Sequence, residues 1–292
     1  MIFISGAAGH LGRAVINHLL TTYKVPPAEI IAGTRDLAKL DDLKAKGVTV
    51  RKADFDDEAG LAKSLHGVSR FLIISTDAMM PGQRLKQHLN AVKAAEAAGV
   101  KHVVYTSMPK PDTSAVLFAP DHAGTEKAIV AAKIDGYTIL RDNWYFENLM
   151  YSIPAALKSG TQYSAAGQGK TAYIAREDLA QAIASVLAAN KGGKHTYTLS
   201  GAKAYTTDEI AVLVSKATGK PLKVVHVPHD GLVQGMIGAG LPEGMAKMFA
   251  SFDVNTAQGG LEGTSADFKM LTGVEPQYFE DWVKNNVAAL SG

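Results

Sequence analysis

The chain has 292 residues, of which 47% are hydrophobic and 20% are charged, as in ordinary globular proteins. Its 30 basic and 28 acidic residues are interspersed and give a net charge of +2, so neither a nucleic-acid surface nor a membrane surface is expected. Cysteine does not occur, which excludes disulfides, thiolate catalysis and cysteine-based metal sites. No leader-like segment or long apolar run is found, so a cytoplasmic protein is expected.

The first twelve residues have the pattern of a strand followed by a glycine-rich turn and a helix. In such units one glycine makes the tight turn, a second lets a phosphate approach, and a third lets the helix pack on the strand. The pattern predicts a dinucleotide-binding turn, and a tight turn without a ligand is the alternative. The residues of this turn are Gly6, Ala7, Ala8, Gly9, His10, Leu11 and Gly12.

Strand and helix patterns then alternate through the first half of the chain. Strands are expected at 1–5, 29–33, 48–51, 70–74, 102–106 and 137–140, with helices at 36–46, 56–67, 81–99 and 124–133. Asp36 and Asp56 are the expected N-caps of their helices, and Pro81 is the expected first residue of the third. This alternation predicts an α/β fold with a Rossmann-type, doubly wound parallel sheet of order 3-2-1-4-5-6.

Beyond residue 142 the pattern loosens. Helices are expected at 144–158 and 176–189, strands at 195–199 and 224–227, and mainly helix in the last sixty residues. Residues 1–142 are therefore predicted to form the nucleotide-binding Rossmann domain. Residues 143–292 are predicted to form a smaller α/β substrate-binding lobe, interleaved with the end of the sheet and lying over its carboxyl edge. Five glycines between 229 and 244 suggest a mobile cover.

The end of the second strand favours NADP(H) over NAD(H). NAD-binding folds usually place an acidic residue there, whereas this chain has Arg35, with Lys39 one turn later. A guanidinium matches the charge and geometry of a 2′-phosphate. The alternative is an ordinary exposed arginine.

Six polar residues and one phenylalanine also follow the third, fourth and fifth strands. These candidates are Asp54, Phe55, Ser75, Thr76, Asp77, Thr106 and Ser107. The first two could hold the adenine edge and face, or be a turn residue and a core aromatic. The others are expected beside the nicotinamide ribose, although Ser75 and Thr76 could equally form a turn.

The general-acid pair of carbonyl-reducing short-chain dehydrogenases is missing. Those enzymes carry Tyr-x-x-x-Lys on a helix, so that the ammonium lowers the phenol pKa. None of the ten tyrosines has a lysine four residues later. Lys127 lies in the right helix, but Ala123 precedes it by four and His122 is one residue out of register. A solvated lysine is expected there, and no catalytic residue is assigned.

This absence narrows the expected chemistry. Flat, electron-poor acceptors such as quinones can take hydride without a strong enzymic acid, flavin or metal, and they need stacking and orientation. The cluster Trp144, Tyr145 and Phe146 could provide both. Ordinary core packing is the alternative, and it is preferred for Phe146.

Several longer motifs support a family resemblance that covers almost the whole chain. They are Ser5-Gly-Ala-Ala-Gly-His-Leu-Gly12, Thr34-Arg35, Val50-Arg-Lys-Ala-Asp54, Ala94-Ala-Glu-Ala-Ala-Gly-Val-Lys101, Tyr105-Thr-Ser107, Thr125-Glu-Lys127, Tyr137-Thr-Ile-Leu-Arg141, Trp144-Tyr145, Glu147-Asn148 and Pro154-Ala-Ala-Leu157. With these motifs the sequence resembles the NmrA-like, atypical short-chain dehydrogenase family. The resemblance is greatest to its branch that reduces quinones and triphenylmethane dyes.

The resemblance implies an NADPH-dependent oxidoreductase acting on a quinone or a similar flat conjugated acceptor, azo and triphenylmethane dyes included. It also implies NADPH along residues 6–11, its 2′-phosphate on Arg35, contacts from residues 75–77, and Lys170 near the acceptor pocket. The implied pocket comprises Asp142, Asn143, Trp144, Tyr145, Phe146 and Glu147, with Ser107 beside it. One departure is the acid at 142 and the amide at 143, where similar members have Asn-Gly.

Two other functions are compatible with parts of the pattern. The first is an NADP(H)-binding redox regulator without turnover, with which the missing Tyr-Lys pair agrees. The second is a sugar-nucleotide epimerase or reductase, against which the missing pair argues. An open, aromatic-lined pocket above the nicotinamide would favour an enzyme, and a filled one a regulator. His226 and His229 flank a proline and are expected to be structural.

Overall fold

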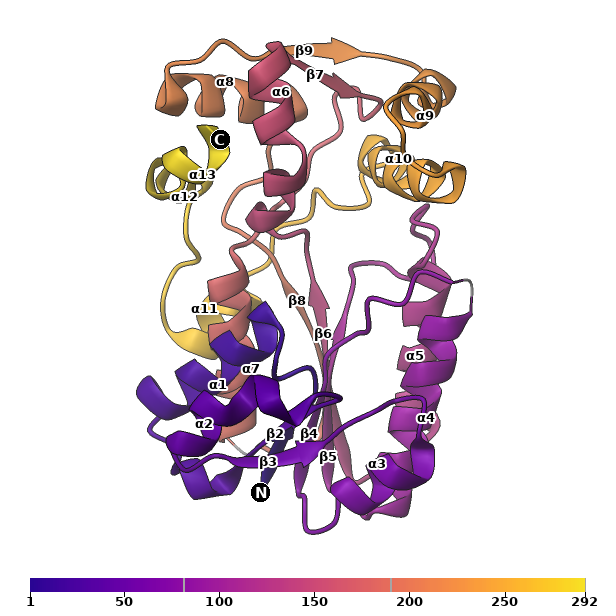
Figure 1. Ribbon diagram of the computed structural model, residues 1–292, viewed down its shortest axis with the longest axis vertical. Helices are drawn as coiled ribbons and strands as arrows, with labels where there is room; N and C mark the ends of the chain where they lie inside the picture. Colours follow the sequence, from indigo (N-terminus) through magenta and orange to yellow (C-terminus); the bar gives the residue numbers. More distant parts are fainter. Residues whose placement is uncertain (81, 190, 292) are drawn as a thin grey trace.

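A parallel sheet of seven strands forms the centre of the computed structural model, which describes residues 1–80, 82–189 and 191–291. Its order is β3-β2-β1-β4-β5-β6-β8 (Figure 1). The strands are β1 (Ile2–Ile4), β2 (Ile30–Thr34), β3 (Thr49–Lys52), β4 (Arg70–Ile73), β5 (His102–Ser107), β6 (Gly136–Asp142) and β8 (Lys194–Leu199). The predicted Rossmann-type order is confirmed, and β8 extends it by pairing with β6.

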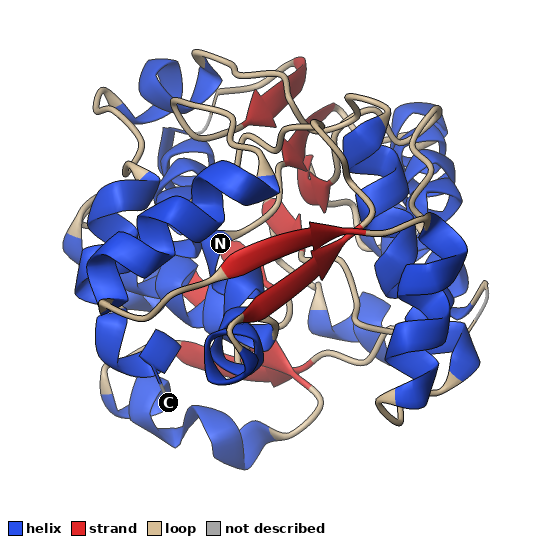
Figure 2. Ribbon diagram, turned by 90° about the horizontal axis from the view of Figure 1, so that it is seen from above, coloured by secondary structure: helices blue, strands red, loops and turns tan. Residues whose placement is uncertain are grey.

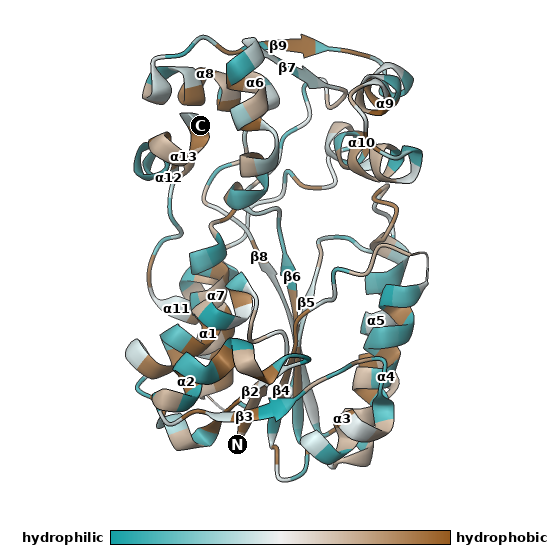
Figure 3. Cartoon of the chain, viewed as in Figure 1, coloured by the Kyte–Doolittle hydropathy of each residue, from teal (hydrophilic) through white to brown (hydrophobic). Residues whose placement is uncertain are grey.

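Helices cover both faces of this sheet (Figure 1). One face carries α1 (His10–Thr21), α2 (Asp41–Ala45), α7 (Arg176–Ala189) and α11 (Asp267–Thr272). The other carries α3 (Glu58–Ser64), α4 (Gln83–Ala97) and α5 (Ala119–Ala131). Hydrophobic and hydrophilic residues alternate around α1 (Figure 3), as expected for a helix with one buried side. Leu19 and Ile183 are fully buried on the first face, and Phe71 and Val103 on the second.

Several predicted helix boundaries need correction. The segment 36–46 is broken into a 3₁₀ turn, η2 (Leu37–Leu40), and α2; Asp36 caps the turn by accepting the Ala38 N–H at 3.2 Å. The N-cap of α3 is Asp57, not Asp56, because an Asx turn on Asp54 takes up residue 56 before the helix starts. The helix predicted at 124–133 begins earlier, at Ala119. The predicted start at Pro81 lies outside the described residues.

The second half builds a layer over the carboxyl ends of the strands, which we call the upper lobe. It contains η3 (Phe146–Tyr151), α6 (Ile153–Ser159), β7 (Thr161–Ser164), α8 (Thr207–Thr218), β9 (Lys223–His226), α9 (His229–Gly238), α10 (Glu243–Ala257), α12 (Phe279–Asn285) and α13 (Val287–Ser291). Seen from above, helices surround its strands (Figure 2). The short strand β7 was not predicted; it pairs in parallel with β9. The predicted strand at 195–199 belongs to the main sheet as β8.

Chain breaks divide the segment after β6. One helix was predicted over 144–158, but η3 ends at Tyr151 and α6 starts at Ile153, with Pro154 in its first turn. The predicted cover between 229 and 244 is mostly the helix α9, which packs on α10 through Leu232, Val233 and Ala246. No helix in the described part of the chain is long and apolar enough to cross a membrane.

Candidate functional site

A cavity of about 480 Å³ lies at the carboxyl ends of β1 to β4, around the glycine turn, and we call it the glycine cleft. It is lined by most of the predicted cofactor-binding residues, namely Gly6, Ala8, Gly9, His10, Leu11, Gly12, Arg35, Asp54, Phe55, Ser75, Thr76 and Asp77. Ala7 is fully buried beneath the turn. Lys170 is exposed in the loop after β7, and it is not among the residues that line the glycine cleft.

The glycines of the turn are required by its geometry. Gly6 has a φ of +60°, which disfavours any side chain. A Cβ on Gly12 would lie 2.4 Å from the Gly6 carbonyl oxygen, so α1 can pack this closely on the turn only without a side chain there. Gly9 is the N-cap of α1 and provides no side-chain cap. The first N–H groups of α1 therefore depend on water or a ligand, which fits a pyrophosphate.

Two buried polar atoms in the glycine cleft lack partners. Within the described residues, Thr76 Oγ1 and Gln87 Oε1 have no hydrogen-bond partner, although both side chains line the cleft. Buried polar atoms without partners are costly, so they mark positions where a ligand can contribute hydrogen bonds. Together with the turn, these unpartnered atoms are compatible with a dinucleotide in the cleft.

The charges at the end of β2 fit an additional phosphate. Arg35 is exposed and lines the cleft. The neighbouring Asp36 is engaged otherwise, because its carboxylate caps η2 and lies 3.9 Å from Lys39 Nζ. Arg35 is thus the cation that directly follows β2 at the predicted 2′-phosphate position.

Asp54 and Phe55 combine the two alternatives considered for them. Asp54 accepts the Asp56 N–H at 3.1 Å, as a turn residue does. Phe55 is only 7% exposed and packs edge-on against Phe71, as a core residue does. Both nevertheless line the glycine cleft.

The two hydroxyl residues at the end of β5 point to different partners. Thr106 Oγ1 accepts the Ser75 N–H at 2.9 Å and so contacts the wall of the cleft. Ser107 Oγ instead donates to Glu126 at 2.6 Å, and Glu126 in turn binds Arg141 through both carboxylate oxygens. Ser107 is therefore part of a buried polar cluster between β5, β6 and α5.

A second cavity, of about 510 Å³, lies within the upper lobe, and we call it the lobe cavity. Its walls are mainly apolar and come from η3, α6, β7, α8, α9 and α10. Six aromatic residues lie on these walls, namely Trp144, Tyr151, Tyr163, Tyr173, Phe249 and Phe252. None of the residues that line it also lines the glycine cleft.

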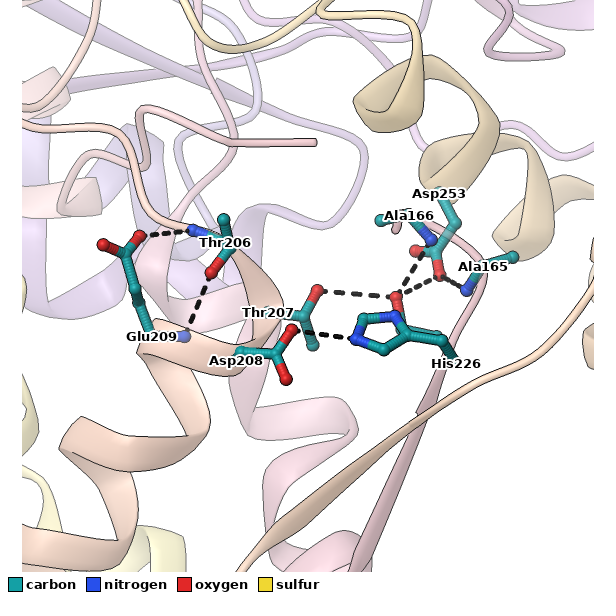
Figure 4. A network of polar contacts seen from close by, with 9 residues as sticks. Ala165, Ala166, Thr206, Thr207, Asp208, Glu209, His226 and Asp253 are labelled. Atoms are coloured by element: carbon teal, nitrogen blue, oxygen red, sulfur yellow. Dashed lines mark hydrogen bonds and ion pairs between the residues drawn. The ribbon is translucent and has the colours of Figure 1, made fainter. Parts of the chain in front are cut away.

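The polar side of the lobe cavity is held by a hydrogen-bond network (Figure 4). Asp253 accepts from the Ser164 hydroxyl at 2.9 Å and from the Ala165 N–H at 2.6 Å, and Ser164 lies 3.4 Å from Thr207 Oγ1. This network joins β7, α8 and α10. Gln162 adds a buried Oε1 without a partner among the described residues.

The two histidines near this network contact different carboxylates. His226 lies 2.9 Å from Asp208 (Figure 4), and His229 lies 3.1 Å from its neighbour Asp230. Each histidine thus has its own carboxylate partner, as expected for a structural role.

The predicted pocket segment after β6 is divided between a cavity and the core. Trp144 lines the lobe cavity and packs edge-on against Phe252, with ring centres 5.2 Å apart. Phe146 is packed against Phe279 and Trp282 in the core of the upper lobe, which was the preferred alternative for it.

The other members of that segment have structural partners. The Asn143 amide donates to the Leu261 carbonyl at 3.0 Å. Glu147 accepts the N–H of Arg176 at the start of α7, at 3.1 Å. Tyr145 packs partly against the core below Arg176, and burial raises the pKa of its phenol. These contacts connect the segment to α7 and to the loop around residue 261.

Asp142 has an unusual environment for an acid. It is 3% exposed, and neither carboxylate oxygen has a partner among the described residues. Burial raises the pKa of this carboxyl well above its ordinary value, so the neutral form is favoured. A protonated carboxyl offers an O–H donor and an acceptor oxygen, whereas a side-chain amide offers an acceptor oxygen and two N–H donors.

The helix α5 does not form the Tyr-Lys acid pair of carbonyl-reducing short-chain dehydrogenases. Lys127 is exposed on α5 and pairs with Asp112 at 3.0 Å. His122 is buried, and its Nδ1 lies 2.8 Å from the Tyr105 hydroxyl.

Sequence reasoning missed the lobe-cavity residues of β7 and α10, because they contain no recognisable motif.

The glycine cleft at the carboxyl edge of a doubly wound sheet is that of a dinucleotide-binding α/β protein. The NmrA-like family model matches residues 1–283, and the chain belongs to this family. It is 42% identical to quinone oxidoreductase 2 of Escherichia coli over 274 residues, which cover 94% of each chain.

Two similar solved structures contain a nucleotide. One is the Escherichia coli NADPH-dependent quinone oxidoreductase complexed with NADPH, with a TM-score of 0.92, 39% identity and full coverage of both chains. The other is the Citrobacter sp. triphenylmethane reductase complexed with NADP(H), with a TM-score of 0.91 and 33% identity over 98% of this chain and 100% of that one. The predicted family and fold are thereby confirmed.

Proposed function

We propose that this protein is an NADPH-dependent, flavin-free oxidoreductase that transfers hydride to a quinone or a similar flat conjugated acceptor. The observation that carries the proposal is a dinucleotide-type cleft together with an open, aromatic-lined cavity above the same sheet. The relatives agree with it, since one is named for quinone reduction and another for triphenylmethane reduction.

In this proposal residues 1–142 act as the NADP-binding domain. The turn at Gly6–Gly12 and the first N–H groups of α1 bind the pyrophosphate, and Arg35 binds the 2′-phosphate. Thr76 and Gln87 offer their unpaired oxygens to the sugar and amide groups. When bound, NADPH supplies the hydride.

Residues 143–292 then provide the acceptor site, although β8 from this part is a strand of the main sheet and α7 packs on one of its faces. The volume of the lobe cavity lies within the roughly 300–1,000 Å³ of small-molecule sites. Trp144 lies two residues after the end of β6 and also lines the cavity, so it connects the sheet edge with the acceptor site. Its ring and that of Phe252 would orient a flat acceptor. Water supplies the proton, because no Tyr-Lys pair is present in the sequence.

The test is consumption of NADPH with a panel of quinones, azo dyes and triphenylmethane dyes. We expect turnover with at least one class, and a loss of about tenfold in kcat/KM for Trp144→Ala, as for a removed stacking partner. NADPH binding without turnover on any acceptor would instead support the redox regulator. Absence of NADPH binding would contradict both.

A further inference from the structure

The loop after β4 is held in an unusual way where it lines the glycine cleft. Three consecutive backbone N–H groups, at positions 74 to 76, each donate to a side chain from a different element. The first two donate to the hydroxyls of Ser5 and Thr106, both at 2.9 Å. The third, of Thr76, donates to His88 Nε2 on α4, at 3.0 Å. The shape of this wall therefore depends on side chains behind it.

The hydrogen bonds of His88 require a single tautomer. Nε2 accepts from Thr76, so its lone pair faces the loop and the proton is on Nδ1. Nδ1 lies 2.9 Å from Thr125 Oγ1, and that hydroxyl itself donates to the Asp121 carbonyl at 2.6 Å. Thr125 can therefore accept the Nδ1 proton, and the chain of donors runs in one direction.

Packing fixes the ring in this orientation. His88 is fully buried and packs edge-on against Tyr105, with ring centres 5.4 Å apart. The Tyr105 hydroxyl has its own acceptor in His122 Nδ1, at 2.8 Å. Burial, followed by the charge of Arg84, lowers the pKa of His88 to about 3, so the neutral ring persists.

We infer that His88 is a positioning residue for the nucleotide. Through Nε2 it holds the Thr76 N–H, and with it the segment 74–77 that lines the cleft, in the conformation that meets NADPH. The Thr76 hydroxyl, which has no partner among the described residues, belongs to the residue whose backbone this contact holds. This inference rests on the proposed function of the cleft.

The test uses two substitutions that differ in one hydrogen bond. His88→Phe keeps a planar ring but leaves the Thr76 N–H unpaired, whereas His88→Gln keeps an oxygen near the position of Nε2. We expect the Kd for NADPH to rise about five- to tenfold in His88→Phe, and to stay within about twofold of wild type in His88→Gln. Calorimetric titration measures this without turnover. In steady state, KM for NADPH should rise while KM for the acceptor stays unchanged.

His122→Phe is the matched control, since His122 is a second buried ring of the same cluster that accepts from Tyr105 and not from the loop. It should lower the melting temperature and leave the Kd for NADPH within about twofold. If His88→Phe does not fold, His88→Asn, which is too short to reach Thr76, takes its place with the same expectation. Wild-type affinity in His88→Phe or in His88→Asn, or an equal loss in His122→Phe, would overturn the inference. Failure of the wild type to bind NADPH would instead overturn the proposed function.

Discussion

The glycine cleft and the lobe cavity are similar in volume but are built in different ways. The cleft is lined largely by short stretches at the ends of four strands, so its shape follows from backbone geometry. The lobe cavity is lined by side chains spread from residue 144 to residue 256. A site built from backbone tolerates few changes in its turns. A site built from side chains can be altered gradually, which suits a family whose members act on different acceptors.

NADPH binding to the glycine cleft should weaken strongly when a side chain blocks the close packing of α1 on the turn. Gly12→Ala places a Cβ about as close to the Gly6 carbonyl as the 2.4 Å found for an ideal atom, so the turn must shift. We expect NADPH to bind about 30- to 100-fold more weakly, equivalent to an overpacking cost of about 2–3 kcal/mol. Fluorescence titration measures the Kd. Gly235→Ala on α9, where no atom lies within 4 Å of the added Cβ, should bind normally. Equal binding by both variants would contradict close packing at the turn.

The second prediction separates charge from backbone in the same cleft. Arg35→Gln should weaken NADPH binding about tenfold, because a charge-assisted hydrogen bond to phosphate is lost. NADH binding should change by less than about twofold, since no 2′-phosphate is present. Lys39→Gln is the control, because Lys39 also lines the cleft but lies beside Asp36. A parallel loss for NADPH and NADH in Arg35→Gln would show that this arginine does not select the phosphate.

Sequence reasoning was more successful for the cleft than for the cavity. The turn at residues 6–12 and the strand order depend on local glycine spacing and on alternation, both of which are visible in one sequence. Asp56 was misplaced by one residue because the Asx turn on Asp54 is a three-dimensional detail. The contribution of Asp253 depends on β7, a strand of four residues that forms only by pairing with β9, 62 positions later in register. Such long-range pairing leaves little local pattern.

In the lobe cavity we expect a graded effect. Phe252→Ala removes the ring that packs edge-on against Trp144, so the acceptor loses part of its apolar wall. KM for the acceptor should rise about fivefold, since partial loss of aromatic contact costs about 1 kcal/mol, while KM for NADPH stays constant. Steady-state kinetics with each substrate varied in turn measures both constants. Val212→Ala, an exposed position of the lobe, is the control. A larger change in KM for NADPH than for the acceptor would place this ring with the cleft instead.

The smallest effect on activity is expected for Asp142→Asn, which introduces the amide that the family resemblance implies at this position. Since the buried acid is favoured in its neutral form, an amide should replace its donor and acceptor, and kcat/KM should change by less than about twofold. Stability should respond instead. In the unfolded chain this carboxyl ionises near the ordinary 3.8, whereas burial raises the pKa of the folded group. Between these values the folded state binds more protons, so the stability of the wild type falls as the pH rises.

Asp142→Asn removes this proton-linked loss. Its advantage in the free energy of unfolding over the wild type should therefore grow as the pH rises above 3.8, and level off once the folded carboxyl ionises. Urea titrations of both proteins across this range measure the difference. The control is Asp142→Leu, which keeps the site uncharged but has no polar side-chain atoms. Its activity should fall if the reaction depends on the donor and acceptor of residue 142. A stability difference that does not vary with pH would mean that folding does not shift the pKa of Asp142, so that the folded carboxyl is ionised above its ordinary pKa. The neutral acid could then no longer be compared with an amide.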